Sequence, residues 1–188
     1  MEGTPLSNNS SNEAGWLTPV SGSPAYDEDL DRLLSRWVRA VSGLPDGVVR
    51  PRWQKDQPPL MPADVNWCAF GITEWPIDNN PAFTMQTETG SELWRHEIFI
   101  AMASFYGPAG MRYASVFRDG ICVEQNNAEL NRLGLSLGDY SEITPFPELI
   151  NNQWVRRYDL RVQLRRKVVR EYNIKSIVDG DVTISTGD

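Results

Sequence analysis

A cationic stretch near the C-terminal end, from Trp154 to Tyr172, constrains the fold of this chain more than any other feature. Its apolar residues recur at every second position, and charged or polar residues occupy the positions between them. The first apolar positions are Tyr158, Leu160, Val162 and Leu164. A period of two over this length is typical of a β-strand with one face in a core and one polar face. The alternation breaks at Arg166, which predicts a bulge or a change in the surroundings of the strand.

The same stretch has a charge opposite to that of its chain. It contains seven Arg or Lys residues and two acids, a local balance of +5, whereas the 188-residue chain has a formal charge of −7. Arg157, Arg161 and Arg165 recur every four residues on the polar face, about 13 Å apart, and Lys167 follows them. This row predicts a salt-bridged or solvated face, an interface with acidic patches of sister subunits, or a track for nucleic-acid phosphates.

The third of these alternatives is a module that binds double-stranded DNA without sequence specificity through residues 156–170. It is disfavoured because the polar face lacks aromatic residues that would stack on bases. The acidic pI of about 4.8 also differs from that of most nucleic-acid-binding proteins, which are basic. The two protein-based alternatives are therefore preferred, and both stay open.

The remaining periodicities predict an α+β fold with a mostly antiparallel sheet and helices packed on one face. The clearest helix spans residues 27–42, where apolar residues recur at helical spacing and Gly43 follows as a stop. Two further helices are expected, one opening at Pro108 and one capped by Asn126 or Asn127. Strands are expected at residues 48–54 on an edge, 66–72, 82–87 paired with 92–106, and 135–143, with a last hairpin turning at Asp179-Gly180.

Two regions are expected along the chain. Residues 1–25 are rich in Ser, Asn, Gly and Pro and predict a flexible N-terminal arm. Trp16 and Leu17 form the only apolar anchor in that arm, for docking on the same subunit or on a neighbour. Residues 26–188 are long enough to form a single α+β domain. No apolar run approaches the roughly 20 residues of a membrane helix, so no membrane partner is expected.

No arrangement of residues predicts catalysis, a metal site or a cofactor. His96 is the only histidine, and its neighbour Glu97 should point to the opposite face of a strand. Cys68 and Cys122 lie in apolar segments and are interpreted as small core residues. One histidine with two distant cysteines does not supply a closed zinc site. The sequence therefore predicts a protein that is not an enzyme.

Short segments spread over residues 16–175 carry a resemblance to a known family. They are WLTP at Trp16, YDEDLDRLLSRWV at Tyr26, GLP at Gly43, VVRPRWQ at Val48, NWCAFGI at Asn66, ELWRHE at Glu92, ASFYGP at Ala103, FRDG at Phe117, EQNNAEL at Glu124 and WVRRYDLRVQLRR at Trp154. In this order and spacing, they resemble the neck or tail terminator proteins of tailed bacteriophages.

The resemblance implies a structural virion protein that is made in the cytoplasm of the host bacterium and sits in the neck, at the head-tail junction. Such subunits are expected to form a hexameric ring that caps the tail tube and contacts the tube protein and the head-connector or adaptor proteins. Double-stranded DNA would pass through the lumen without sequence-specific binding. The resemblance implies no catalytic residue and no cofactor. Arg157, Arg161, Arg165 and Lys167 are then expected at a subunit interface or in the lumen.

Overall fold

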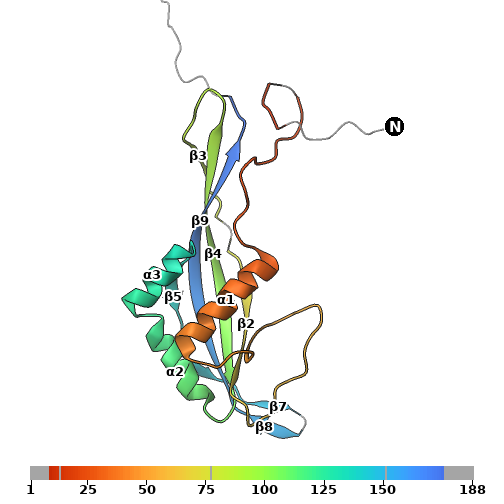
Figure 1. Ribbon diagram of the computed structural model, residues 1–188, viewed down its shortest axis with the longest axis vertical. Coiled ribbons are helices and arrows are strands. Elements are labelled where there is room, and N and C mark those ends of the chain that lie inside the picture. The colour runs from red at the N-terminus through yellow and green to blue at the C-terminus, as the bar shows by residue number, and fades with distance from the viewer. Residues whose placement is uncertain (1–8, 13, 77, 151, 176–188) are drawn as a thin grey trace, which may run out of the picture. The chain divides into compact units, whose positions relative to one another are not determined.

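A computed structural model describes residues 9–12, 14–76, 78–150 and 152–175 (Figure 1). Its elements are α1 (Asp27–Ser42), β1 (Val49–Pro51), β2 (Trp67–Glu74), β3 (Ala82–Thr84), β4 (Ser91–Tyr106), α2 (Gly110–Gly120), α3 (Glu124–Arg132), β5 (Ser136–Tyr140), β6 (Thr144–Pro145), β7 (Glu148–Ile150), β8 (Gln153–Val155) and β9 (Arg157–Tyr172). The hairpin predicted at Asp179-Gly180 lies outside the described residues.

Most strands belong to one sheet, in which the order is β1-β2-β4-β9-β5, with β3 paired to β4 and β6 paired to β9. β1 runs parallel to β2, whereas β2 and β3 are antiparallel to β4, and β5 and β6 are antiparallel to β9. The predicted α+β class with a mostly antiparallel sheet is confirmed. The strand containing Pro51 lies at an edge, as predicted from its missing N–H group.

The chain divides into two compact units. The larger unit comprises Ala25–Ile77 and Glu97–Arg166 and contains all three helices of the described residues. The smaller unit comprises the described residues up to Pro24, together with Asp78–His96 and the described residues from Lys167 onward. The long strands β4 and β9 contribute residues to both units.

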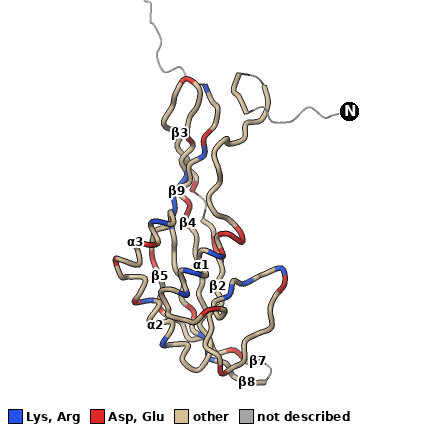
Figure 2. The backbone as a smooth tube through the Cα atoms, in the orientation of Figure 1, with Lys and Arg blue, Asp and Glu red and all other residues tan. Residues whose placement is uncertain are grey.

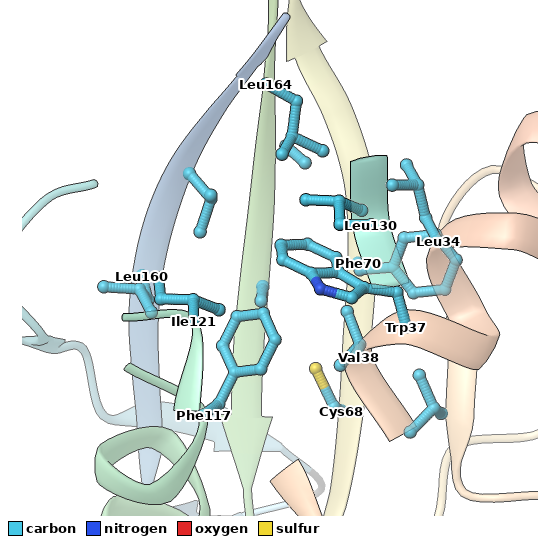
Figure 3. Close-up of a cluster of buried hydrophobic side chains, with 14 of the residues drawn as sticks. Leu34, Trp37, Val38, Cys68, Phe70, Phe117, Ile121, Leu130, Leu160 and Leu164 are labelled. Carbon is cyan, nitrogen blue, oxygen red and sulfur yellow. The ribbon is translucent and has the colours of Figure 1, made fainter. Parts of the chain in front are cut away.

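The core of the larger unit lies between the helices and one face of the sheet (Figure 3). Its helical members include Leu30, Leu34, Trp37 and Val38 of α1, Ala114 and Phe117 of α2, and Leu130 of α3. Its strand members include Cys68 and Phe70 of β2, Phe99, Ala101, Ala103 and Phe105 of β4, and Leu160, Val162 and Leu164 of β9. All three helices share this core with the same strand faces, so the predicted packing of helices on one face is confirmed.

Helix α1 has the predicted bounds because several local signals agree. Its buried residues follow one helical stripe, and three acids, Asp27, Glu28 and Asp29, occupy its positive first turn. Gly43 takes a φ of 72° and donates its N–H to the Arg39 carbonyl, which ends the helix. No helix among the described residues is long and apolar enough to span a membrane.

Two local predictions were wrong. Helix α3 begins at Glu124, directly after the extended residue Val123, and not after Asn126 or Asn127. Asn126 therefore lies inside the helix, where its amide nitrogen donates to the Gly120 carbonyl (2.8 Å). Cys122 is exposed and not a core residue; it follows α2 and its C-cap residue Ile121, and its sulfur lies 3.2 Å from the hydroxyl of Tyr140. Cys68 is buried as predicted, and burial raises the pKa of its thiol.

The smaller unit is built on the hairpin of β3 and the first part of β4. Thr87 donates its N–H to the Gly90 carbonyl (2.8 Å) and closes the turn, so the predicted hairpin is confirmed. The ring of Phe83 lies 6.5 Å from that of Tyr172 at the end of β9. On that same end, Glu171 accepts a hydrogen bond from the Val20 N–H (2.8 Å), which holds the N-terminal segment against β9.

Candidate functional site

Within the larger unit, Arg157, Arg161 and Arg165 of β9 lie on the sheet face opposite the helices, which we call the polar face. Leu160, Val162 and Leu164 are buried in the core beneath the helices. The alternation of side chains along a strand therefore places the intervening residues on the other face. The residues of β9 that lie on the polar face of the larger unit are Arg157, Asp159, Arg161, Gln163 and Arg165. Figure 2 shows the basic residues along β9. The alternation predicted from the sequence is thus confirmed.

Arg157 is held inside the subunit. Its guanidinium donates to both carboxylate oxygens of Asp159, at 2.7 and 2.8 Å, and also to Glu148 of β7. The rings of Phe146 and Tyr106 lie 5.2 and 5.9 Å from its guanidinium carbon. Only 12% of its side chain is exposed. Burial opposes the charge, but the hydrogen bonds to Asp159 and the nearby negative groups outweigh it and raise the pKa of Arg157.

The partner of Arg157 belongs to a longer polar network on the same face. The Ser104 hydroxyl of β4 donates to Asp159, and Arg52 in turn donates to the Ser104 oxygen. Ser104 is fully buried. The Nε of Arg52 is buried without a hydrogen-bond acceptor among the described residues. This network joins the segment after β1 to the sheet, because it links Arg52 through Ser104 to Asp159, the carboxylate that pairs with Arg157.

Arg161 and Arg165 differ from Arg157 in exposure. Arg161 pairs with Glu74 at the end of β2, and the two side chains are 49% and 51% exposed. Such a surface pair contributes about 0–1 kcal/mol to stability. Arg165 is exposed and has no ion pair within the described parts of the chain. It lies across the bulge of β5, where a Cβ at Gly138 would come within 2.8 Å of its Nε.

Lys167 belongs to the smaller unit and contacts an aromatic ring. Its Nζ lies 2.9 Å from the centre of the Trp94 ring, which places the ammonium over the indole face. The sequence-predicted row thus separates into an internally bound Arg157, the exposed Arg161 and Arg165, and the ring-bound Lys167.

Arg166 forms a buried ion pair that the sequence analysis did not predict. Only 4% of its side chain is exposed, and its Nε donates to Glu97 of β4 at 2.8 Å. A terminal nitrogen donates to the Ala25 carbonyl (2.5 Å), and the Tyr26 hydroxyl donates to Glu97 (2.6 Å). The rings of Tyr26, Trp75 and Phe99 lie 4.3, 5.6 and 5.8 Å from the guanidinium carbon.

A signal for this buried pair is present in the sequence. Arg166 stands at a core-facing position of the β9 alternation, and Glu97 stands at a core-facing position of β4, two residues before Phe99. Two residues of opposite charge at core-facing positions of two strands predict a buried ion pair. The expectation that His96 and Glu97 face opposite ways is confirmed, because His96 is exposed and Glu97 is 9% exposed.

Trp16 and Leu17 are not buried in a core of the described residues. Trp16 is 74% exposed and Leu17 is partly buried. The N-terminal segment is instead attached through polar bonds, in which Val20 donates to the Glu171 carbonyl and Ser21 accepts from the Glu171 N–H (3.0 Å). The anchoring role of Trp16 and Leu17 stays a prediction.

Comparison with known proteins gives the class of the chain. The sequence model of the family described as phage neck terminator protein matches residues 28–188, which include the described helices, apart from the first residue of α1, and the whole sheet. This match places the chain among structural proteins of the phage neck. The chain belongs to the phage neck terminator protein family. No curated protein matches the sequence.

Proposed function

We propose that this neck terminator assembles with copies of itself into a hexameric ring. The ring ends the tail tube and joins it to head-connector or adaptor proteins, and double-stranded DNA passes through its lumen without sequence-specific binding. The subunits are made in the host cytoplasm and become part of the head-tail junction. The observation that carries the proposal is the family match over residues 28–188.

The charge distribution supports a contact between copies. The polar face presents the exposed Arg161 and Arg165 in a chain with a formal charge of −7. A neighbouring copy therefore supplies acidic surface for these cations, and opposite charges across an interface favour correct docking. We assign Arg161, Arg165 and Lys167 to a subunit interface or the lumen. Arg157 serves that surface indirectly, because its charge is bound within the subunit.

The test is charge reversal of the exposed pair, Arg161→Glu with Arg165→Glu. Both side chains are exposed, so the subunit should stay folded. Assembly should be lost, because like charges across an interface cost several kcal/mol. Native mass spectrometry and light scattering measure assembly at low and moderate salt. The matched control, Arg112→Glu with Arg132→Glu, changes the net charge equally at exposed positions on α2 and α3 and should still assemble.

A DNA-retention assay on the same proteins separates the alternatives. An intact ring with lost, salt-sensitive DNA retention would favour the DNA-binding module of residues 156–170 over the interface. An intact ring with unchanged retention would mean that the cations form a solvated face. A wild-type protein that stays monomeric at all concentrations would refute the ring.

A further inference from the structure

A small hairpin on the larger unit presents two large apolar side chains to solvent. Leu149 of β7 and Trp154 of β8 face each other across the strands and are 57% and 72% exposed. The neighbours Ile150 and Val155 turn the other way and pack in the cluster beneath the hairpin. Leu149 and Trp154 therefore form one exposed apolar surface, which we call the apolar knob. Clustered apolar exposure of this kind marks a protein contact.

The knob is held in place before any partner arrives. A two-stranded hairpin is marginally stable alone, but Arg157 donates to Glu148 at its base and lies 5.2 Å from the Phe146 ring. Val155 adds an anchor, because it is only 9% exposed. A surface fixed in this way loses little conformational freedom when it docks, which favours binding.

A groove of about 1010 Å³ lies elsewhere on the same unit, between α1 and the segment that follows β1. We call it the α1 groove, and its lining includes Glu28, Asp31, Arg32, Ser35, Arg36, Pro51, Trp53, Gln54, Lys55 and Asp56. Pockets of roughly 300–1,000 Å³ enclose drug-sized ligands, so this one has room for an indole and a leucine side chain.

Trp53 gives the α1 groove an apolar wall. Its backbone takes a φ of 55°, which is uncommon outside glycine, and its side chain is 70% exposed. The indole lies against the backbone of Gly71, where a Cβ would come within 2.7 Å of a ring carbon. The missing side chain at Gly71 thus lets the exposed ring of Trp53 lie directly against the backbone of β2. Strained backbone of this kind is concentrated at functional positions.

The charges of the α1 groove cancel. The lining contains three acids and three bases, namely Glu28, Asp31, Asp56, Arg32, Arg36 and Lys55. A balanced lining selects neither a polyanion nor a polycation. The exposed indole therefore suits an apolar knob, and the same chain carries such a knob.

We propose that the apolar knob of one copy docks in the α1 groove of the next copy. This inference rests on the ring of the proposed function and assigns it two contact surfaces. Knob and groove share no residue, so the contact is head-to-tail, the arrangement that closes into a ring when its rotation permits. The knob contributes apolar side chains and the groove lining has no net charge, so the contact should persist in salt that screens Arg161 and Arg165.

The experiment uses two full-length variants that each remove one half of the contact. Leu149→Ser with Trp154→Ser removes the knob and keeps the groove. Trp53→Gly removes the groove wall, and glycine suits the φ of 55° at that position. The control is Leu133→Ser, a 52% exposed leucine on the same unit. Circular dichroism and thermal midpoints establish that each variant is folded.

The expected results are specific to a head-to-tail contact. Each variant alone should need roughly 30-fold or more higher concentration to assemble than wild type, as for an interface hot spot. The control should assemble normally. An equimolar mixture of the two variants should form one-to-one pairs, because each supplies the half that the other lacks. These pairs should survive about 0.5 M salt, at which the screening length falls below about 5 Å.

Other results would refute the contact between knob and groove, and they can be distinguished from a failure of the ring itself. If wild type and both variants all form rings, the ring stands and the knob-groove contact is wrong. If the variants form rings but no longer attach to tails or heads, the knob binds another virion protein and the second-copy proposal is wrong. If mixing gives no pairs, the two surfaces do not meet. If wild type forms no oligomer, both proposals fail.

Discussion

The buried ion pair of Arg166 and Glu97 gives the sharpest test of how this fold is stabilised. The two side chains are only 4% and 11% exposed, and Arg166 Nε lies 2.8 Å from Glu97 Oε2. We consider Glu97→Gln, which keeps the shape of the side chain and removes its charge. The guanidinium then stays buried with the Ala25 carbonyl and aromatic rings as its remaining partners.

The magnitude follows from the burial of the remaining cation. Removing one partner of a buried pair costs about 3–5 kcal/mol, because an uncompensated charge is left in a poorly solvated site. For a chain of this size each kcal/mol corresponds to about 2–4 °C in thermal midpoint. Glu97→Gln should therefore lower the midpoint by roughly 6–20 °C. Replacing both partners, with Glu97→Leu and Arg166→Met, should restore most of the lost stability, since no unpaired charge is left.

The assay is urea unfolding of wild type, Glu97→Gln, Glu97→Leu, Arg166→Met and the double variant, with the coupling energy taken from the cycle of Glu97→Leu and Arg166→Met. Glu74→Gln is the matched control, because it removes the same charge from the half-exposed pair with Arg161 and should cost less than about 1 kcal/mol. The reasoning is refuted if Glu97→Gln costs no more than this control, or if the coupling energy falls below about 0.5 kcal/mol.

Two further predictions concern the core and the N-terminal segment. Trp37→Ala should cost about 3–5 kcal/mol in urea unfolding, because Trp37 is 8% exposed and packs edge-on against Phe117 at 5.1 Å; a cost under about 1 kcal/mol would refute its place in the core. Deletion of residues 1–24 should leave the thermal midpoint nearly unchanged and weaken assembly in native mass measurements, whereas unfolding of the truncated subunit would contradict an arm role. The cut must precede Ala25, because its carbonyl accepts from Arg166.

Most of the fold follows from local patterns in the sequence. Helix α1 and strand β9 were predictable because each has a long, consistent period, and burial of one face enforces that period. The turn at Gly90 was predictable from short-range chemistry alone. The start of helix α3 was misplaced because Asn126 is a good cap by residue type, whereas the chain enters the helix two residues earlier, after the extended residue Val123. Residue type alone does not show where the backbone turns into the helix.

The hairpin of β7 and β8 was missed because its strands have three residues each, too few to display a period. One of its contacts is with Arg157, which donates to Glu148 nine residues earlier in the chain and lies 5.9 and 5.2 Å from the rings of Tyr106 and Phe146. The partners of Arg157 and Arg161 could not be assigned from the sequence, because both depend on tertiary pairing. Glu74, for example, is 87 residues from Arg161.

The arginines of β9 show that the role of a charged residue depends on which face of the sheet its strand position points to. Arg166 points into the core, where an unpaired charge would destabilise the fold. Glu97 provides the negative charge that pairs with it. Arg157 points to the polar face, but its side chain is mostly buried and pairs with Asp159 and with Glu148 of β7. Arg161, Arg165 and Lys167 are the basic residues that share the alternate positions of Arg157 and are exposed. A partner for the positive charge of this strand should therefore engage these residues, and reversal of Arg161 and Arg165 tests that surface without disturbing either enclosed arginine.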